Sequence, residues 1–216
     1  MAQIFHPAFN TLSKVSFFGA VFFLGAAVWA WDTMLRSPYT TQVDVAREQP
    51  VPFSHKHHVA GLGIDCRFCH TSVEDGAFAG IPPTKTCMGC HSLVWEDAPL
   101  LEPVRESYKS DMPIEWARVH DLPDYTYFDH SIHLNRGIGC SSCHGEVDQM
   151  PLMWRENTLN MDWCLSCHRD PVAHVRPKEF LFDMSFDPEA QPREEREALA
   201  REYGVKSLTN CSICHR

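Results

Sequence analysis

The ten cysteines of this chain all fall within one repeated string, Cys-x-x-Cys-His. The string occurs at Cys66–His70, Cys87–His91, Cys140–His144, Cys164–His168 and Cys211–His215, numbered here motifs 1 to 5. Cys-x-x-Cys-His is the attachment signature of c-type haem, in which two thiols bond to the porphyrin edge and the adjacent histidine ligates iron. The sequence therefore predicts five covalently bound haems c, and a chain so loaded with redox centres is expected to move electrons.

Each motif assigns three side chains to its haem. We expect thioether bonds from Cys66, Cys69, Cys87, Cys90, Cys140, Cys143, Cys164, Cys167, Cys211 and Cys214, and proximal iron ligation by His70, His91, His144, His168 and His215. Paired cysteines can instead form a zinc site or a disulfide framework. A zinc site needs no histidine directly after the second cysteine, so five such histidines favour haem.

The second axial ligands are expected among the other histidines. In Phe53-x-His55-x-x-His58 and Phe128-x-His130-x-x-His133, two histidines share one helix face, so they suit two neighbouring irons better than one. The predicted distal ligands are His55, His58, His120, His130 and His133, with Met161 as an alternative and His57 and His174 less favoured. The other interpretation of each is a surface histidine or, for Met161, packing against porphyrin. Methionine ligation would raise the reduction potential.

Residues 53–92 and 128–170 repeat the same plan. Each begins with Phe-x-His-x-x-His and contains two haem motifs, which predicts two diheme units in tandem. The proline-containing insertion at 93–127 should be mostly loop. Residues 192–204 (PREEREALAREYG) predict a helix before the fifth motif at 211–215, because proline opens the segment, glutamates fill its first turn and glycine ends it.

The N-terminal region predicts a membrane anchor. Residues 15–31 contain no charge, and with their flanks they reach about 20 residues, the length of a membrane-spanning helix. Trp29 and Trp31 suit an outer aromatic belt, and Lys14 marks the inner edge. A cleavable signal peptide is the alternative, but the apolar run exceeds a typical signal core. Haem attachment is extracytoplasmic in bacteria, so the residues after about 40 should lie in the periplasm.

These features predict three parts: a cytoplasmic end with transmembrane anchor (1–36), a linker (37–52) and a periplasmic pentahaem cytochrome c domain (53–216). Its fold should be mostly α with extensive loops. The formal net charge of −9 disfavours nucleic acid, which needs a basic face. The acidity suits a basic redox partner, or it serves only to keep the protein soluble.

The Phe-x-His-x-x-His spacing resembles that of cytochromes c3 and c7, which implies that His55 and His130 serve the haems of motifs 1 and 3 while His58 and His133 serve haems elsewhere. Three longer stretches resemble the membrane-anchored pentahaem cytochrome subunit of bacterial alternative complex III: FSHKHHVAGLGIDCRFCHTSVEDGAFAGIPPTKTCMGCHS (53–92), VHDLPDYTYFDHSIHLNRGIGCSSCHGEVDQM (119–150) and MDWCLSCHRDP (161–171).

That resemblance implies an electron-relay subunit of a quinol-oxidising respiratory or photosynthetic complex at the bacterial inner membrane. The partners implied are an iron–sulfur subunit related to molybdopterin oxidoreductases, polytopic quinol-binding subunits and a monohaem cytochrome c. Electrons would leave to a periplasmic carrier or a terminal oxidase. The first alternative is a stand-alone quinol dehydrogenase of the NapC/NrfH type, which has one N-terminal helix and binds quinol itself. A multihaem reductase, for example of nitrite, is the second alternative.

Overall fold

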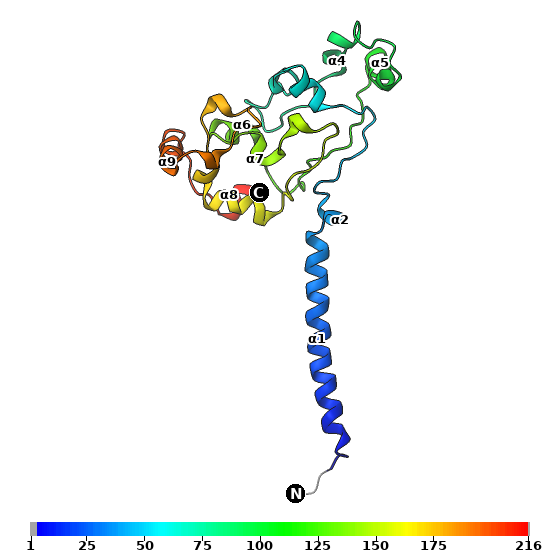
Figure 1. The fold of residues 1–216 in the computed structure, drawn as a ribbon, viewed down its shortest axis with the longest axis vertical. Helices are drawn as coiled ribbons and strands as arrows, with labels where there is room; N and C mark the ends of the chain where they lie inside the picture. Colours follow the sequence, from blue (N-terminus) through cyan, green and yellow to red (C-terminus); the bar gives the residue numbers. More distant parts are fainter. Residues whose placement is uncertain (1–3, 216) are drawn as a thin grey trace. The chain divides into compact units, whose positions relative to one another are not determined.

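A computed structural model gives the fold of the chain and describes residues 4–215 (Figure 1). The chain forms two compact units that divide between Gln42 and Val43, inside the predicted linker. The first unit contains α1 (Ala8–Arg36) and α2 (Pro38–Thr41). The second unit contains all five haem motifs.

Helix α1 is a single apolar helix of 29 residues. At about 1.5 Å rise per residue it is roughly 43 Å long, which exceeds the ~30 Å hydrocarbon core of a bilayer. None of its residues is buried against the protein, and no charge interrupts it between Lys14 and Asp32. The helix ends where Ser37 turns to extended backbone before Pro38, since the residue preceding proline disfavours the helical conformation. Its length and composition are those of a single-pass membrane anchor.

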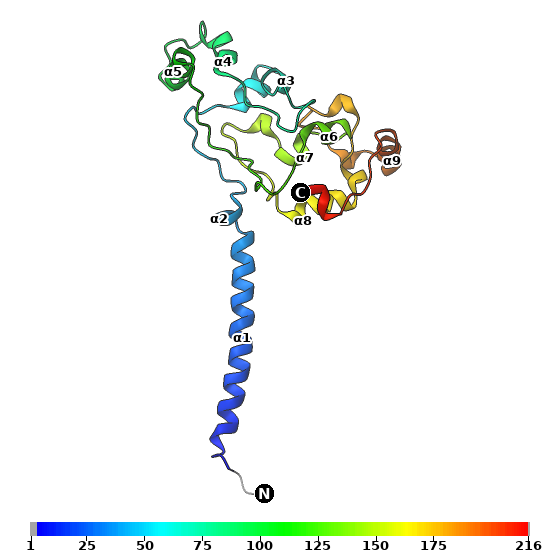
Figure 2. The ribbon, with the colours of Figure 1, turned by 180° about the vertical axis from the view of Figure 1, so that it is seen from behind.

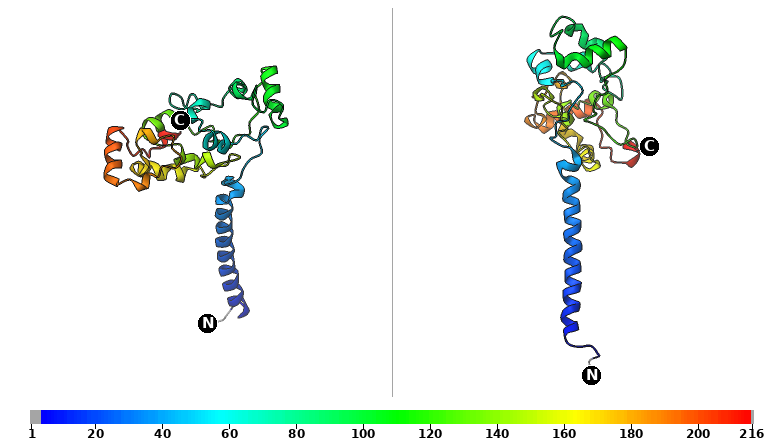
Figure 3. Two further views of the ribbon diagram at one scale, coloured as in Figure 1. Left: turned by 45° about the horizontal axis from the view of Figure 1, so that its top comes forward. Right: turned by 90° about the vertical axis from the view of Figure 1, so that its right-hand side faces the viewer.

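The second unit is built from short helices and turns joined by long connections (Figures 2 and 3). They are η1 (Lys56–Gly61), α3 (Cys66–Cys69), α4 (Thr84–His91), η2 (Pro99–Leu101), α5 (Glu102–Ser110), α6 (His130–Asn135), α7 (Ser141–His144), η3 (Val147–Gln149), α8 (Met161–Arg169), η4 (Pro171–His174), η5 (Lys178–Phe180), η6 (Pro188–Ala190), α9 (Arg193–Glu202) and α10 (Cys211–Cys214). Within residues 43–215 the extended pairing consists of three isolated bridges. The expected mostly helical fold with extensive loops is confirmed.

The protein core of this unit is small. One cluster consists of Val51, Leu101 and Val104, and the other of Val73, Leu134 and Leu181. Motif cysteines pack beside both clusters, Cys87 against the first and Cys140 against the second, so the attachment points adjoin the core.

The insertion at 93–127 contains a helix that the prolines concealed. Helix α5 has Pro103 in its first turn, where proline is tolerated because the missing N–H would have had no intrahelical partner. It buries Val104 and packs against α4, and Ser107 Oγ lies 3.1 Å from Thr84 Oγ1. The remainder of the insertion is mostly irregular, as expected.

The helix predicted over 192–204 is confirmed as α9. Pro192 caps its N-terminus, Glu194 and Glu195 occupy its first turn, and Gly204 follows with a φ of +64°. Glycine adopts this left-handed conformation without the steric cost that other residues bear. The helix packs against η4, directly after motif 4.

Candidate haem centres

All five motifs place their two cysteines on one helical turn. Motif 1 forms α3, motif 2 lies in α4, motif 3 forms α7 with its capping residue, motif 4 lies in α8, and motif 5 forms α10. Residues three apart on a helix share a face, so both thiols of a motif point to one side. In motif 1 the turn is capped by Asp65, whose carboxylate accepts from the backbone N–H of Arg67 at 2.8 Å.

The ten cysteines are free thiols in the part of the chain that the structure describes. Over those same residues, no group of three or more cysteine, histidine or carboxylate side chains converges as a zinc site requires.

Most motif histidines are held by their Nδ1 atom. In four of them this nitrogen donates to a backbone carbonyl: His70 to Gly80 (2.7 Å), His91 to Val94 (3.0 Å), His168 to Leu208 (3.0 Å) and His215 to Tyr125 (3.1 Å). Such a bond fixes the tautomer and the ring orientation, and it leaves Nε2 free to ligate a metal. His144 differs, because its Nδ1 is buried without a hydrogen-bond partner and burial lowers its pKa to about 3.

The two Phe-x-His-x-x-His segments have the same geometry. The phenylalanine meets the first histidine edge-on, with ring centroids 4.9 Å apart for Phe53–His55 and 4.8 Å for Phe128–His130, and stacks on the second, at 4.4 Å for Phe53–His58 and 4.5 Å for Phe128–His133. The second histidine also donates Nδ1–H to the carbonyl four residues earlier, at 2.8 Å in the first segment and 2.7 Å in the second. The phenylalanine therefore fixes the angle between the two imidazoles in both segments.

Three histidine pairs stand at nearly the same separation. The ring centroids lie 6.2 Å apart in His58–His91, 6.2 Å in His133–His168 and 6.3 Å in His130–His144. A metal–imidazole bond is about 2.0 Å long and the ring centre lies roughly 1 Å beyond its nitrogen, so two imidazoles on opposite sides of one iron have centroids roughly 6 Å apart. The three pairs match this span. Together with the thiols beside them, they form donor sets that fit c-type haem.

His55 and His120 are two further, half-buried histidines, and each has one buried ring nitrogen that lacks a hydrogen-bond partner. Burial lowers the pKa of both to about 4, with the nearby His70 ring as the next cause at His55 and Arg155 as the next at His120. His55 is thus a neighbour of the motif 1 histidine. The His120 ring lies only 4.3 Å from that of His144, a gap too short for an iron between the two rings.

None of the remaining candidates opposes a motif histidine in a ring pair among the described residues, although the His57 ring meets that of His58 edge-on at 5.3 Å. Met161 opens α8 and is 68% exposed. His57 is exposed and stacks on Trp95 with ring centroids 5.7 Å apart. His174 is half-buried at the end of η4. His57 therefore lies at the surface beside a tryptophan, on the same turn as His58.

Cysteines of different motifs are close enough to raise one another's pKa. Burial is the largest cause at each of four thiols, and the next is a cysteine of another motif: Cys87 for Cys69, Cys66 for Cys140, Cys167 for Cys143, and Cys214 for Cys164. These neighbours link motif 1 with 2, 3 with 1, 4 with 3 and 5 with 4. The motifs therefore follow one another in space in the order 2–1–3–4–5, which can be followed from α4 to the C-terminus in Figure 2.

The two diheme units are joined by a reciprocal exchange of backbone hydrogen bonds. His130 donates both its backbone N–H and its Nδ1–H to the carbonyl of Ala77, at 3.2 and 2.7 Å. In return, Lys56 donates its N–H to the carbonyl of Met150 at 3.1 Å. Ala77 follows motif 1 and Met150 follows motif 3. In each unit, the turn that carries the two histidines is thus hydrogen-bonded to the segment that follows the first motif of the other unit. These bonds hold motifs 1 and 3 together.

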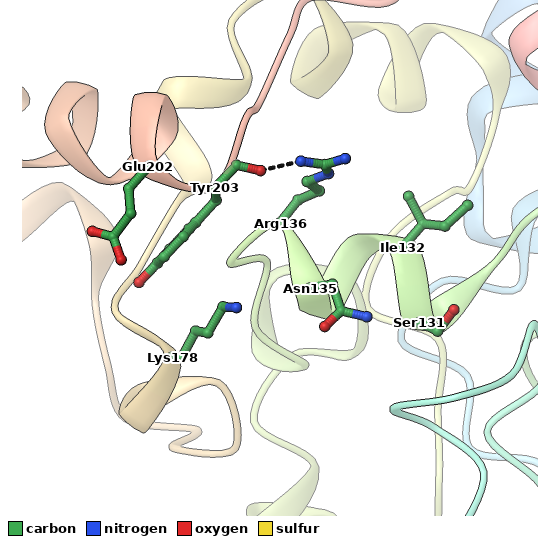
Figure 4. A pocket seen from close by; sticks show the side chains of 7 residues that line it. All are labelled: Ser131, Ile132, Asn135, Arg136, Lys178, Glu202 and Tyr203. Carbon is green, nitrogen blue, oxygen red and sulfur yellow. Dashed lines mark hydrogen bonds between the residues drawn. The ribbon is translucent and has the colours of Figure 1, made fainter.

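A pocket of about 480 Å³ lies between α6 and α9 (Figure 4). The residues that line it are Ser131, Ile132, Asn135, Arg136, Lys178, Glu202 and Tyr203. The Arg136 guanidinium donates to the carbonyl of Tyr203, and Lys178 Nζ sits 5.0 Å from the centre of the Tyr203 ring. The α6 residues of the pocket occupy the helix face opposite His130 and His133. The pocket is therefore separate from the sites to which these histidines point.

The site consists of helical Cys-x-x-Cys turns that lie beside opposed imidazoles, around a small apolar core. These features define the class of protein. The chain is a multihaem c-type cytochrome with one N-terminal membrane anchor, an electron-transport protein. Residues 126–216 match the family model of cytochrome c7 and related cytochrome c.

Over 176 residues the chain is 38% identical to the multihaem cytochrome c subunit of menaquinone reductase from Nitratidesulfovibrio vulgaris strain Hildenborough. The alignment covers 69% of this chain and 80% of that protein. The chain belongs to this family of multihaem cytochrome c subunits. The relative is part of a menaquinone reductase, so the narrower resemblance to alternative complex III remains a prediction.

Proposed function

We propose that this chain is the five-haem electron-relay subunit of a quinone-linked oxidoreductase complex in the bacterial cytoplasmic membrane, with its haem domain on the periplasmic side. The observation that carries the proposal is the set of three imidazole pairs at 6.2–6.3 Å, each beside a Cys-x-x-Cys turn. Haem c, when bound, supplies a one-electron carrier at each motif. Everything else is done by the protein, which orients the ligands, covers the sites and sets their spacing.

The geometry supports one ligand pairing for each of four motifs. His58 serves motif 2, His130 serves motif 3 and His133 serves motif 4, each opposite the motif histidine. His55 serves motif 1, because it lies beside His70 and occupies the same place in its segment as His130 does in the second.

Motif 5 has two candidates for its second ligand. One is His120, the predicted ligand left over from the other four motifs; its buried Nε2 lacks a hydrogen-bond partner, and its ring lies beside His144 of motif 3. The other is Met161, which opens α8 one turn before Cys164; burial raises the pKa of Cys164, and so does the nearby Cys214 of motif 5. A near-infrared sulfur-to-iron charge-transfer band, lost in Met161→His, would assign methionine. Its absence from the native protein would favour His120.

The spatial order 2–1–3–4–5 supports a relay with motifs 2 and 5 at its ends. Motifs 2 and 1 are joined through the turn that carries His55 and His58, and motifs 3 and 4 through α6. Motifs 4 and 5 are joined by the Nδ1 bond of His168 and by Ser207, whose hydroxyl donates to the carbonyl of His168 at 2.8 Å. Electrons enter at one terminal motif and leave at the other.

The partners are those of a hetero-oligomeric complex. The menaquinone reductase relative supports a quinone-linked assembly, and the resemblance to alternative complex III suggests an iron–sulfur subunit related to molybdopterin oxidoreductases, polytopic quinol-binding subunits and a monohaem cytochrome c. The two relationships differ in the direction of electron flow. A complex of the alternative complex III type oxidises quinol, whereas a menaquinone reductase delivers electrons to quinone.

The test begins with the complex purified from its native membrane. Mass spectrometry of this chain should give the polypeptide plus five haems, and fewer haems would contradict the count. The complex is then mixed with a reduced menaquinone analogue or, separately, with a reduced periplasmic cytochrome and the oxidised analogue. Haem reduction by quinol assigns the oxidising direction. If the chain alone oxidises quinol as fast as the complex does, it is instead a stand-alone dehydrogenase of the NapC/NrfH type.

A further inference from the structure

Arg176 is the largest fully buried side chain in the described part of the molecule. Only 1% of its surface is exposed, although arginine carries a charge that is costly to remove from water. Its position is fixed by the backbone, because its N–H donates to the carbonyl of Gly137 at 2.9 Å beside the bridge between Ile138 and Val175. A buried guanidinium retains its proton at any physiological pH, so this is a permanent internal cation.

The guanidinium lies directly against motif 3. One Nη donates to the Ser142 hydroxyl, between the two cysteines of that motif, at 3.1 Å. The other donates to the carbonyl of Asp183 at 3.2 Å. Gly139 makes room for the group, since a Cβ atom there would lie 2.5 Å from the Arg176 Cζ atom. The cation therefore lies beside the attachment point of one particular haem.

Arg176 forms no ion pair within residues 4–215; burial lowers its pKa, and the more distant carboxylates of Asp183 and Asp187 act in the opposite direction. Within residues 4–215 its guanidinium contacts a hydroxyl, backbone carbonyls and the ring of Phe186, whose centroid is 5.2 Å from Cζ. Its Nε is buried without a hydrogen-bond partner. A buried charge with no opposite charge in contact with it usually destabilises a protein. A cation kept in such a place is expected to have a role that a neutral side chain could not fill.

We propose that Arg176 is a potential-setting residue whose buried guanidinium raises the reduction potential of the haem attached through Cys140 and Cys143. Reduction adds one electron and so one unit of negative charge to that site, and a nearby cation in a weakly polar surrounding stabilises the reduced form. Motif 3 is the middle of the order 2–1–3–4–5. Arg176 therefore favours the reduced state at this central position of the relay. The inference rests on motif 3 carrying haem, as proposed above.

The experiment is a redox titration of the purified complex followed by low-temperature EPR, in the native protein and in Arg176→Gln. The motif 3 component is first identified with His130→Met, which changes the g values and the potential of that haem. In Arg176→Gln the same component should become at least tenfold harder to reduce, which is about 59 mV for a one-electron couple. The control is Arg136→Gln, which removes an exposed cation three residues before Gly139. It should leave the reduction equilibrium constant of the motif 3 component within threefold of the native one.

The outcomes separate the possible roles. An Arg176→Gln protein with five haems by mass and an unmoved motif 3 component would overturn the proposal, and so would a shift confined to another component. If the glutamine variant does not assemble, Arg176→Lys gives the answer, because it keeps the charge and loses the planar fork. If the lysine variant keeps the reduction equilibrium constant of the motif 3 component within threefold of the native one, the role is electrostatic. A tenfold drop in that constant shows a structural role. A missing haem in the native chain would instead contradict the proposed function.

Discussion

At the scale of single residues, the chemistry of the sites depends on which ring nitrogen of each histidine is already engaged. Seven histidines commit Nδ1 to a backbone carbonyl: His58, His70, His91, His130, His133, His168 and His215. The bond presents Nε2 in a fixed direction and makes the ring a better ligand. Pre-oriented rings of this kind lower the reorganisation that each change of oxidation state would otherwise require.

The first prediction concerns His133, which faces His168 at 6.2 Å. His133→Met should raise the reduction potential of the motif 4 haem, because thioether ligation favours the reduced iron more than a second imidazole does. The measurement is a redox titration followed by EPR, in which one component moves upward. His57→Met serves as the control, since that exposed ring stacks on Trp95. If both variants shift a component equally, His133 is not a ligand.

The second prediction concerns the space at Gly139. A methyl group there would lie 2.5 Å from Cζ of Arg176, whose guanidinium is held on several sides. Gly139→Ala should lower the free energy of unfolding by about 1–3 kcal/mol, the usual cost of overpacking. Urea unfolding of the haem-loaded protein measures it. Gly61→Ala, where the nearest atom is 3.6 Å from the new methyl group, should change stability much less. Equal effects would contradict the close approach of Arg176.

The sequence predicts the types of residue at the sites better than their partners. Cysteine spacing identifies the attachment points because a covalent haem needs that local pattern. The carbonyls that orient the histidines cannot be predicted in this way. Gly80 and Leu208 contribute only backbone atoms, so their side chains carry no signal. Arg176 was also missed, because an isolated arginine in a sequence usually lies at the surface.

At the scale of elements, short helices are held by contacts between segments far apart in the chain. Helix α9 shows this most clearly. Arg193 makes a two-pronged ion pair with Asp170, at 3.1 and 3.2 Å, and Arg196 donates to the carbonyl of Ala173 at 2.8 Å. Both arginines thereby fasten α9 to the segment that follows motif 4. The helix itself was predictable from its local signals, but this docking was not, because it joins residues 23 apart.

The third prediction tests that docking. Asp170→Asn should lower the free energy of unfolding by about 0.5–1 kcal/mol at neutral pH, since a partly exposed pair contributes modestly even with bidentate geometry. The bond to Arg193 holds the pKa of Asp170 below its usual value. The carboxylate's contribution is therefore present above the ordinary aspartate pKa and disappears as the pH falls through the lowered one.

Thermal unfolding at pH 7 and at about pH 3 measures the difference between Asp170→Asn and the native protein, which should shrink at the acidic pH. The control is Glu106→Gln, which removes a pair within α5 between Glu106 and Lys109. That pair is exposed and joins no distant segments, so its loss should change stability less than the loss of the Asp170 pair does. If the difference in stability between the native protein and Asp170→Asn is the same at both pH values, the ion pair does not contribute as proposed.

At the scale of the whole molecule, the chain order of the motifs differs from their spatial order. The duplication is visible in the sequence, since both units begin with the same aromatic and histidine pattern. The pattern does not reveal that the two units are hydrogen-bonded to each other: the carbonyl of Ala77 accepts from His130, and the carbonyl of Met150 accepts from Lys56. Those bonds all end on backbone carbonyls, which leave no signal in the sequence, and they hold motif 1 beside motif 3.

The fourth prediction concerns the division of the chain between Gln42 and Val43. Helix α1 buries none of its residues within the protein, and every haem motif lies after the division. Replacing residues 1–42 by a cleavable export signal should therefore release a soluble protein that keeps its full haem content and its visible spectrum. The full chain, expressed in parallel, should stay with the membrane after alkaline washing. Both results follow if α1 serves as an anchor and the haem domain matures outside the cytoplasm. A released domain that lacks haem would show that the first 42 residues also take part in haem attachment or folding, and a full chain recovered in the soluble fraction would contradict the anchor.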